Sequence, residues 1–188
     1  MRILIIISLL FVFFACTNDI KDVKKIVEDK DLKVEIAYDV KILYSDSAKV
    51  KVRITSPTLK RYSSHGDTYD EFPDGLLVEF LDDNKRVKSW LEAEYAIRKD
   101  RDKKIYVENN VVLFNKKEDK LMTDELIWDE ANEELYTNKP VKIAQPSVGD
   151  TSFGFGFKAD QSFTRFEIHR KFSSIKNVDE FSKDFDKK

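Results

Sequence analysis

Cysteine is nearly absent from this sequence, which holds one Cys, five Gly, four Pro and two His among 188 residues. A single Cys excludes an internal disulfide framework. So few Gly and Pro residues exclude a collagen-like or low-complexity chain. No His/Cys cluster has the spacing of a zinc site, so we expect no metal and no cofactor.

An excess of basic charge is also missing. Lys and Arg number 33 against 35 Asp and Glu, which gives a formal net charge of −2. Without a basic field the chain has no means of holding nucleic acid, and we expect no such partner. The 41% of hydrophobic residues and the 14 Phe are too many for a disordered chain and sufficient for one domain.

The sequence contains no recognisable catalytic constellation. A nucleophilic enzyme pairs Ser or Cys with a base, but His65 lies in a loop-like segment and His169 ends a predicted strand. There is no P-loop pattern to hydrolyse nucleotide. We therefore assign no catalytic residue and expect that the protein is not an enzyme. Paired carboxylates of the glycoside hydrolase kind stay open as an alternative.

The N-terminus has the pattern of an export signal. The apolar run over residues 3–15 is interrupted only by Ser8, and it is shorter than the about 20 residues that span a bilayer. It ends in Phe-Phe-Ala-Cys, which resembles the bacterial lipobox, with a small residue before the lipid-accepting Cys16. We predict a signal peptide over 1–15 and lipid attachment at Cys16. The alternative is a buried free Cys in an N-terminal helix.

Three further segments follow the predicted signal. Residues 16–31 are polar and serve as the lipid anchor and tether, residues 32–170 form the folded domain, and residues 171–188 form a charged tail. Apolar residues of the tail, from Phe172 to Phe185, recur every three or four positions. That spacing fits a short amphipathic helix, and a frayed tail fits equally well.

Between residues 32 and 170 the hydrophobic period is two. Val50, Val52 and Ile54 alternate with Lys and Arg, as in a strand with one wet face. More than ten such runs, separated by turns every 8–12 residues, predict an all-β sandwich, barrel or jelly roll. A faint repeat of 30 positions aligns Tyr106 with Tyr136 and Val111 with Val141. This repeat favours stacked hairpins, as in a β-solenoid or an elongated jelly roll.

Several segments together resemble the LptC family, the periplasmic component of the lipopolysaccharide export ABC transporter, in the lipoprotein-like form of Bacteroidetes-type bacteria. The resemblance covers roughly residues 34–168 and is carried by residues 44–57, 71–80, 93–97, 107–112 and 126–129. It implies an elongated twisted β-jelly roll of stacked antiparallel hairpins with an open apolar groove. It also implies a location on the periplasmic side of the cell envelope, with the inner membrane favoured for the lipid anchor.

The resemblance further implies a task. The protein receives lipopolysaccharide from the inner-membrane ABC transporter subunits and passes it to an LptA-like periplasmic bridge protein. One face of each strand would line the groove. Our lining candidates are Val50, Val52, Ile54, Val78, Phe80, Trp90, Ile105, Val107, Leu126, Trp128, Phe155 and Phe157. Each of these side chains fits a dry sandwich core equally well.

Strand edges would supply the partner contacts. We predict that an early strand with Val40, Ile42 and Tyr44 faces the transporter. A late strand over residues 163–169, with Phe163, Phe166 and Ile168, would face the bridge protein. The alternative function is a lipid-anchored β-sandwich that acts as a scaffolding or interaction module with no lipid cargo.

Overall fold

The computed structural model describes residues 33–64 and 67–176. The predicted signal peptide, Cys16, the tether and residues 177–188 of the predicted tail lie outside the described residues, as does His65. Within the described part the one helix is η2 (Pro146–Val148), a single 3-10 turn, and no helix there is long and apolar enough to cross a membrane.

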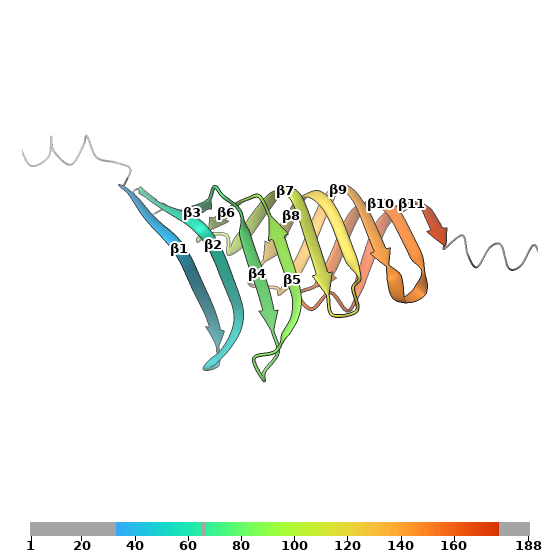
Figure 1. Ribbon diagram of the computed structural model, residues 1–188. Coiled ribbons are helices and arrows are strands. Elements are labelled where there is room, and N and C mark those ends of the chain that lie inside the picture. The colour runs from blue at the N-terminus through green and yellow to red at the C-terminus, as the bar shows by residue number, and fades with distance from the viewer. Residues whose placement is uncertain (1–32, 65–66, 177–188) are drawn as a thin grey trace, which may run out of the picture. The chain divides into compact units, whose positions relative to one another are not determined.

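All other regular structure is β, and eleven strands form one antiparallel sheet (Figure 1). This confirms the predicted all-β, jelly-roll class. The strands are β1 (Lys33–Asp46), β2 (Lys49–Ser64), β3 (Asp67–Phe72), β4 (Leu76–Leu81), β5 (Val87–Ala93), β6 (Tyr95–Lys99), β7 (Lys104–Asn115), β8 (Lys120–Asp129), β9 (Glu134–Gln145), β10 (Asp150–Asp160) and β11 (Phe166–Lys176).

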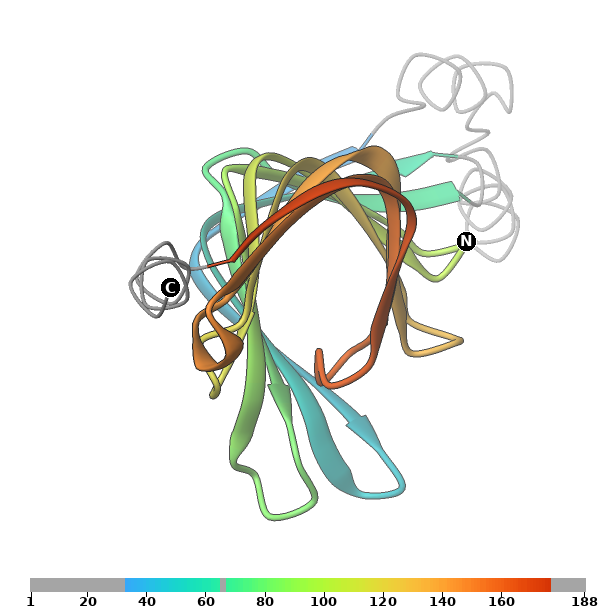
Figure 2. The same ribbon diagram turned by 90° about the vertical axis from the view of Figure 1, so that its right-hand side faces the viewer.

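The long strands take part in two walls of the roll. Residues 52–55 of β2 pair with β4, whereas residues 60–64 pair with β3. In the same way residues 112–115 of β7 pair with β5, and residues 104–108 pair with β6. We call the side with β4 and β5 the first wall and the side with β3 and β6 the second wall. The view along the roll shows the strands curving from one wall into the other (Figure 2).

Each long strand turns a corner between the walls, at residues that suit a break in the ladder. In β7 the corner is Asn109-Asn110, both with positive φ, and Asn is the residue type that best tolerates this after Gly. In β9 it is the exposed segment 138–140, which ends in Pro140, a residue without an N–H to give to the ladder. Register shifts mark the corners of β7, β8 and β10.

The predicted 30-residue repeat is a structural repeat. β7 and β9 have nearly the same burial pattern, with buried residues alternating on both sides of three exposed corner positions. Ile105 corresponds to Leu135, and Val111 to Val141, and all four side chains are buried. Alternation therefore keeps the same face inward in both walls.

Several strand boundaries do not follow the apolar runs of the sequence. The runs that begin at Ile105 and Val111 belong to one strand with a corner, because pairing with β8 resumes after the exposed segment between them. The run over 87–97 forms two strands, β5 and β6, which separate at Glu94. The strand β3 was missed because its sequence, DTYDEF, is too polar to stand out.

The two ends of the sheet also differ from prediction in detail. Among the described strands, β1 pairs only with β2 and β11 pairs only with β10. β11 begins at Phe166, so Phe163 lies in the preceding turn and not in the strand, because Asp160 holds that turn together. β11 also runs to Lys176, past the predicted domain end at residue 170, since β10 continues to pair with it back to Asp150.

Candidate functional site

The candidate site is the interior between the two walls. Nine of the predicted lining residues lie on the inner faces of strands and belong to one hydrophobic cluster, each exposed by 4% or less. They are Val52, Ile54, Val78, Phe80, Ile105, Val107, Leu126, Trp128 and Phe157. Val50 shares the inner face of β2 and is half-buried, because it stands near the start of the strand.

The structure places Trp90 on the outer face of the first wall. Its neighbours Ser89 and Leu91 are fully buried, so the side chain of Trp90 points the other way. There it stacks on Phe114, with ring centroids 5.2 Å apart. Trp90 is therefore wrong as a lining residue, because strand alternation and not side-chain hydrophobicity decides its face.

Phe155 is also on the outer face, where it meets Phe172 edge-on at 5.1 Å. Simple alternation would put Phe153, Phe155 and Phe157 on one face, but the register of β10 on β9 shifts between Phe155 and Phe157. Gly156 makes this irregularity, with φ +71°. The bulge places Phe157 inside and leaves Phe155 outside.

The interior is apolar as predicted, but at these nine positions it is closed to water and is not an open groove. Side chains from the two walls meet directly. Phe80 of the first wall packs edge-on against Trp128 of the second, with centroids 5.1 Å apart. An apolar ligand can occupy this space only if the walls separate.

The N-terminal part of the roll is closed by Tyr44 of β1. Its ring lies 6.5 Å from that of Trp128, and the Arg98 guanidinium lies over it at 5.1 Å. Burial raises the pKa of the Tyr44 hydroxyl to about 12, although Arg98 acts in the opposite direction. The hydroxyl is therefore neutral at every physiological pH and serves packing, not proton transfer.

Charged residues at this end of the roll are paired. Arg98 is largely buried and makes two hydrogen bonds to Glu130, at 2.7 and 3.1 Å, and a third to Asp100. Burial opposes the charge of Arg98, but the bonds to Glu130 and the surrounding acidic groups raise the pKa of its guanidinium overall. On the neighbouring strand β3 the buried Asp70 pairs with Arg61 of β2 at 2.7 Å. These pairs satisfy the charges of Arg98, Glu130 and Asp70.

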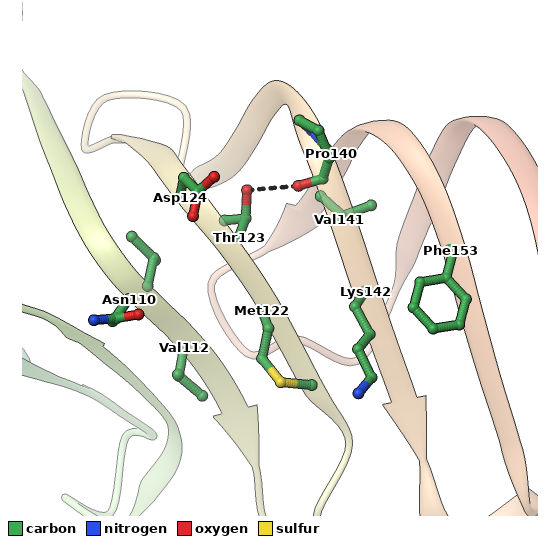
Figure 3. Close-up of a pocket in the computed structure, with 10 residues that line it drawn as sticks. Asn110, Val112, Met122, Thr123, Asp124, Pro140, Val141, Lys142 and Phe153 are labelled. Carbon is green, nitrogen blue, oxygen red and sulfur yellow. Dashed lines mark hydrogen bonds between the residues drawn. The ribbon is translucent and has the colours of Figure 1, made fainter.

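The depression in Figure 3 lies outside the roll. Its floor includes a cross-strand row on the outer face, Val112, Met122, Lys142 and Phe153, which the sheet register brings side by side. The Lys142 ammonium lies 5.9 Å from the Phe153 ring. This row is separate from the inner surface. Among the described residues no group of His, Cys, Asp and Glu could hold a metal ion.

Comparison with known proteins decides the family. Residues 1–174 match the family described as "Lipopolysaccharide-assembly, LptC-related", and this match takes in the whole β-domain except the last two residues of β11. The chain belongs to the LptC family. Comparison with curated proteins gives no match.

Membership of the LptC family makes the chain a component of lipopolysaccharide transport, acting in the periplasmic cell envelope. The family is one of transport and assembly components. The resemblance noted in the sequence is thereby confirmed, together with the all-β jelly roll that it implied, whereas the implied open groove is closed at the nine inner positions.

Two groups of residues at the site do not stand out in the sequence. The ion pairs around Arg98 were not found, because β3 was not predicted and the partners are distant in sequence. Phe163 was assigned to an edge strand, yet it is fully buried in the interior beside Phe157. The position of Phe163 in a turn is indicated in the sequence by Asp160, Ser162 and Thr164, because these residue types favour turns.

The separation of inner and outer residues predicts unequal costs for two Phe→Ala variants. Phe80→Ala empties part of the interior and should lower the free energy of unfolding by about 3–5 kcal/mol. Phe155→Ala removes a half-buried outer side chain and should cost about 1 kcal/mol. Urea unfolding of both variants measures the difference. Equal costs would contradict the placement of Phe155 outside the roll.

Proposed function

We propose that this chain holds the acyl chains of lipopolysaccharide inside the roll, taking them from the inner-membrane ABC transporter and passing them to an LptA-like bridge protein. The observation that supports this most is a continuous apolar row on the inner face of the first wall. Sheet register aligns six buried side chains from β2 to β9: Ile54, Val78, Leu91, Leu113, Leu121 and Ile143.

The row runs across the strands and therefore along the roll. With about 4.8 Å between neighbouring strands, six residues extend over about 24 Å. A parallel row in the second wall contains Ile105, Trp128, Leu135 and Ala159. An apolar row of about 24 Å, faced by this shorter row of about 14 Å, suits an extended hydrocarbon chain better than a compact ligand. Each buried methylene contributes about 0.8 kcal/mol, so a path that stays dry avoids a large cost at every step.

Trp128 favours this function over a scaffold without cargo. Its indole N–H is buried inside the roll and has no acceptor among the described residues. A buried donor without an acceptor lowers the stability of the folded state by about 1–3 kcal/mol. The ester and amide carbonyls that join acyl chains to a lipid headgroup are acceptors that cargo would bring. The closed interior, in contrast, favours a scaffold without lipid cargo.

The edges of the sheet would carry the partner contacts, with β1 facing the transporter and β11 facing the bridge protein. Each has a free side among the described strands, and an exposed edge pairs readily with a strand of another chain. Exposed apolar side chains lie on both, with Leu43 at 55% and Phe172 at 62% exposed. We further propose that Cys16 carries the lipid anchor that keeps the chain at the inner membrane.

Photo-crosslinking in cells tests the function. A benzophenone analogue of Phe in place of Phe80 should give lipopolysaccharide adducts, because Phe80 is an inner residue of the first wall. The same analogue in place of Phe114, which faces outward in that wall, is the control and should give few or none. Adducts at neither position, in a folded and functional chain, would favour the scaffold.

The two edges predict opposite binding defects. Phe172→Asp should weaken binding to the bridge protein and leave the transporter contact intact, because it places a charge beside β11. Leu43→Asp should do the reverse at β1. Both side chains are exposed, so each change should alter the free energy of unfolding by only about 0.5 kcal/mol. Pull-downs of each partner, beside a thermal melt, measure this. If either variant lost binding to both partners, the assignment of one partner to each edge would be contradicted.

The anchor is tested by Cys16→Ser. No other thiol in the chain can accept lipid. The variant should therefore stay as an unprocessed precursor and fail to incorporate a labelled fatty acid, whereas wild type incorporates it. Normal processing and labelling of the variant would exclude Cys16 as the lipidated residue.

A further inference from the structure

The turn between β10 and β11, residues 161–165, crosses from the second wall to the first. Figure 2 shows it in orange-red, curving inward at the side of the roll opposite the corners. The Ser89 hydroxyl of β5 donates a hydrogen bond to the carbonyl oxygen of Gln161. The Asn115 amide at the end of β7 donates one to the carbonyl oxygen of Phe163, at 2.8 Å. The turn therefore closes the roll over its C-terminal half.

Internal hydrogen bonds make this turn a preformed unit. The Asp160 carboxylate accepts bonds from the backbone N–H and the hydroxyl of Thr164, at 2.9 and 2.8 Å, and from the Ser162 hydroxyl at 3.1 Å. The Phe163 N–H donates to the Asp160 carbonyl at 3.0 Å. None of these bonds involves the first wall, so the turn can keep its shape when it leaves that wall.

Phe163 fills the interior from this turn. It is 1% exposed, and its ring lies 5.9 Å from Phe157 and 5.4 Å from Phe166. Its backbone has φ +49°, a left-handed conformation that a bulky residue seldom adopts. Such local strain persists where surrounding contacts hold it, and it often marks a segment that moves in function.

The attachment of the turn to the first wall is weak by comparison with the rest of the sheet. Neighbouring strands share ladders of backbone hydrogen bonds, whereas the turn meets β5 and β7 through the two side-chain bonds of Ser89 and Asn115. Asn115 is itself fixed by Asp119, so the first wall presents a rigid surface to the turn. Release of the turn breaks no strand pairing.

We propose that the 161–165 turn is a movable closure of the roll, and that an acyl chain reaches the C-terminal half of the interior by displacing Phe163. The inference rests on the proposed function for its cargo, but the motion of the turn is a property of the chain alone. In this proposal the position of the Phe163 side chain controls the transfer of lipopolysaccharide toward the bridge protein. In the closed state Phe163 keeps the C-terminal interior dry.

The motion is tested without cargo by thiol labelling. Ser89 is completely buried, whereas Ser152 of β10 is 5% exposed and lies away from the turn. A static structure therefore predicts slower labelling of Ser89→Cys than of Ser152→Cys. A movable turn predicts the reverse, with residue 89 labelled at least about tenfold faster and faster than global unfolding. Mass spectrometry of the labelled peptides separates either site from Cys16. Equal rates, or labelling at residue 89 at the rate of unfolding, would overturn the proposal.

Passage of cargo is tested by locking the turn. Ser89→Cys and Gln161→Cys joined by a short thiol crosslinker should abolish lipopolysaccharide adducts from a benzophenone analogue at Phe166, beside Phe163, and leave those at Phe80 unchanged. Gln161→Cys alone is the control. Undiminished adducts at Phe166 in the locked chain would overturn the proposal. Absence of adducts at both positions in the unlocked chain would count against the proposed function, and the labelling rates would still decide the motion.

Discussion

The corner in each long strand is the constraint on which the rest of the structure depends. A flat sheet would leave one apolar face open to water, and burial of that face is the main driving force for folding. Here β7 and β9 bend at three exposed residues and keep the alternation in phase on both sides. The same strand therefore supplies inner side chains to both walls. The core forms where the inner faces of these two walls, which belong to one sheet, pack on each other.

A core made in this way can open without loss of strand pairing. Backbone pairing is interrupted at the corners and resumes on both sides of them, so separation of the walls breaks side-chain contacts such as Phe80 with Trp128 and no ladder. Exposing the inner faces to water would cost about 25 cal/mol per Å² of apolar surface. An acyl chain that enters as the walls part replaces one apolar contact by another. A closed interior is thus compatible with a carrier that opens only for its cargo.

Alternation in the sequence was sufficient to predict most of the inner face, and the failures have physical causes. Trp90 stands between Lys88 and Glu92 on the outer face of β5. These charged neighbours indicate the face of Trp90 better than the size of its ring does. Phe155 could not be placed from the period alone, because Gly156 shifts the register on β9. Gly inside an apparent strand is a sign of a bulge, but pairing with the neighbours decides where the face changes.

Phe163 shows what local reasoning cannot supply. The turn around it is readable from Asp160 and Thr164, yet its position in the interior depends on Ser89 and Asn115, which lie many residues earlier in the chain. The turn leads directly into β11, which begins at Phe166 with its ring against Phe163. Closure of the roll and the C-terminal edge are thus consecutive in the chain. Under the proposed function, a strand added at β11 would lie beside the segment through which the cargo must leave.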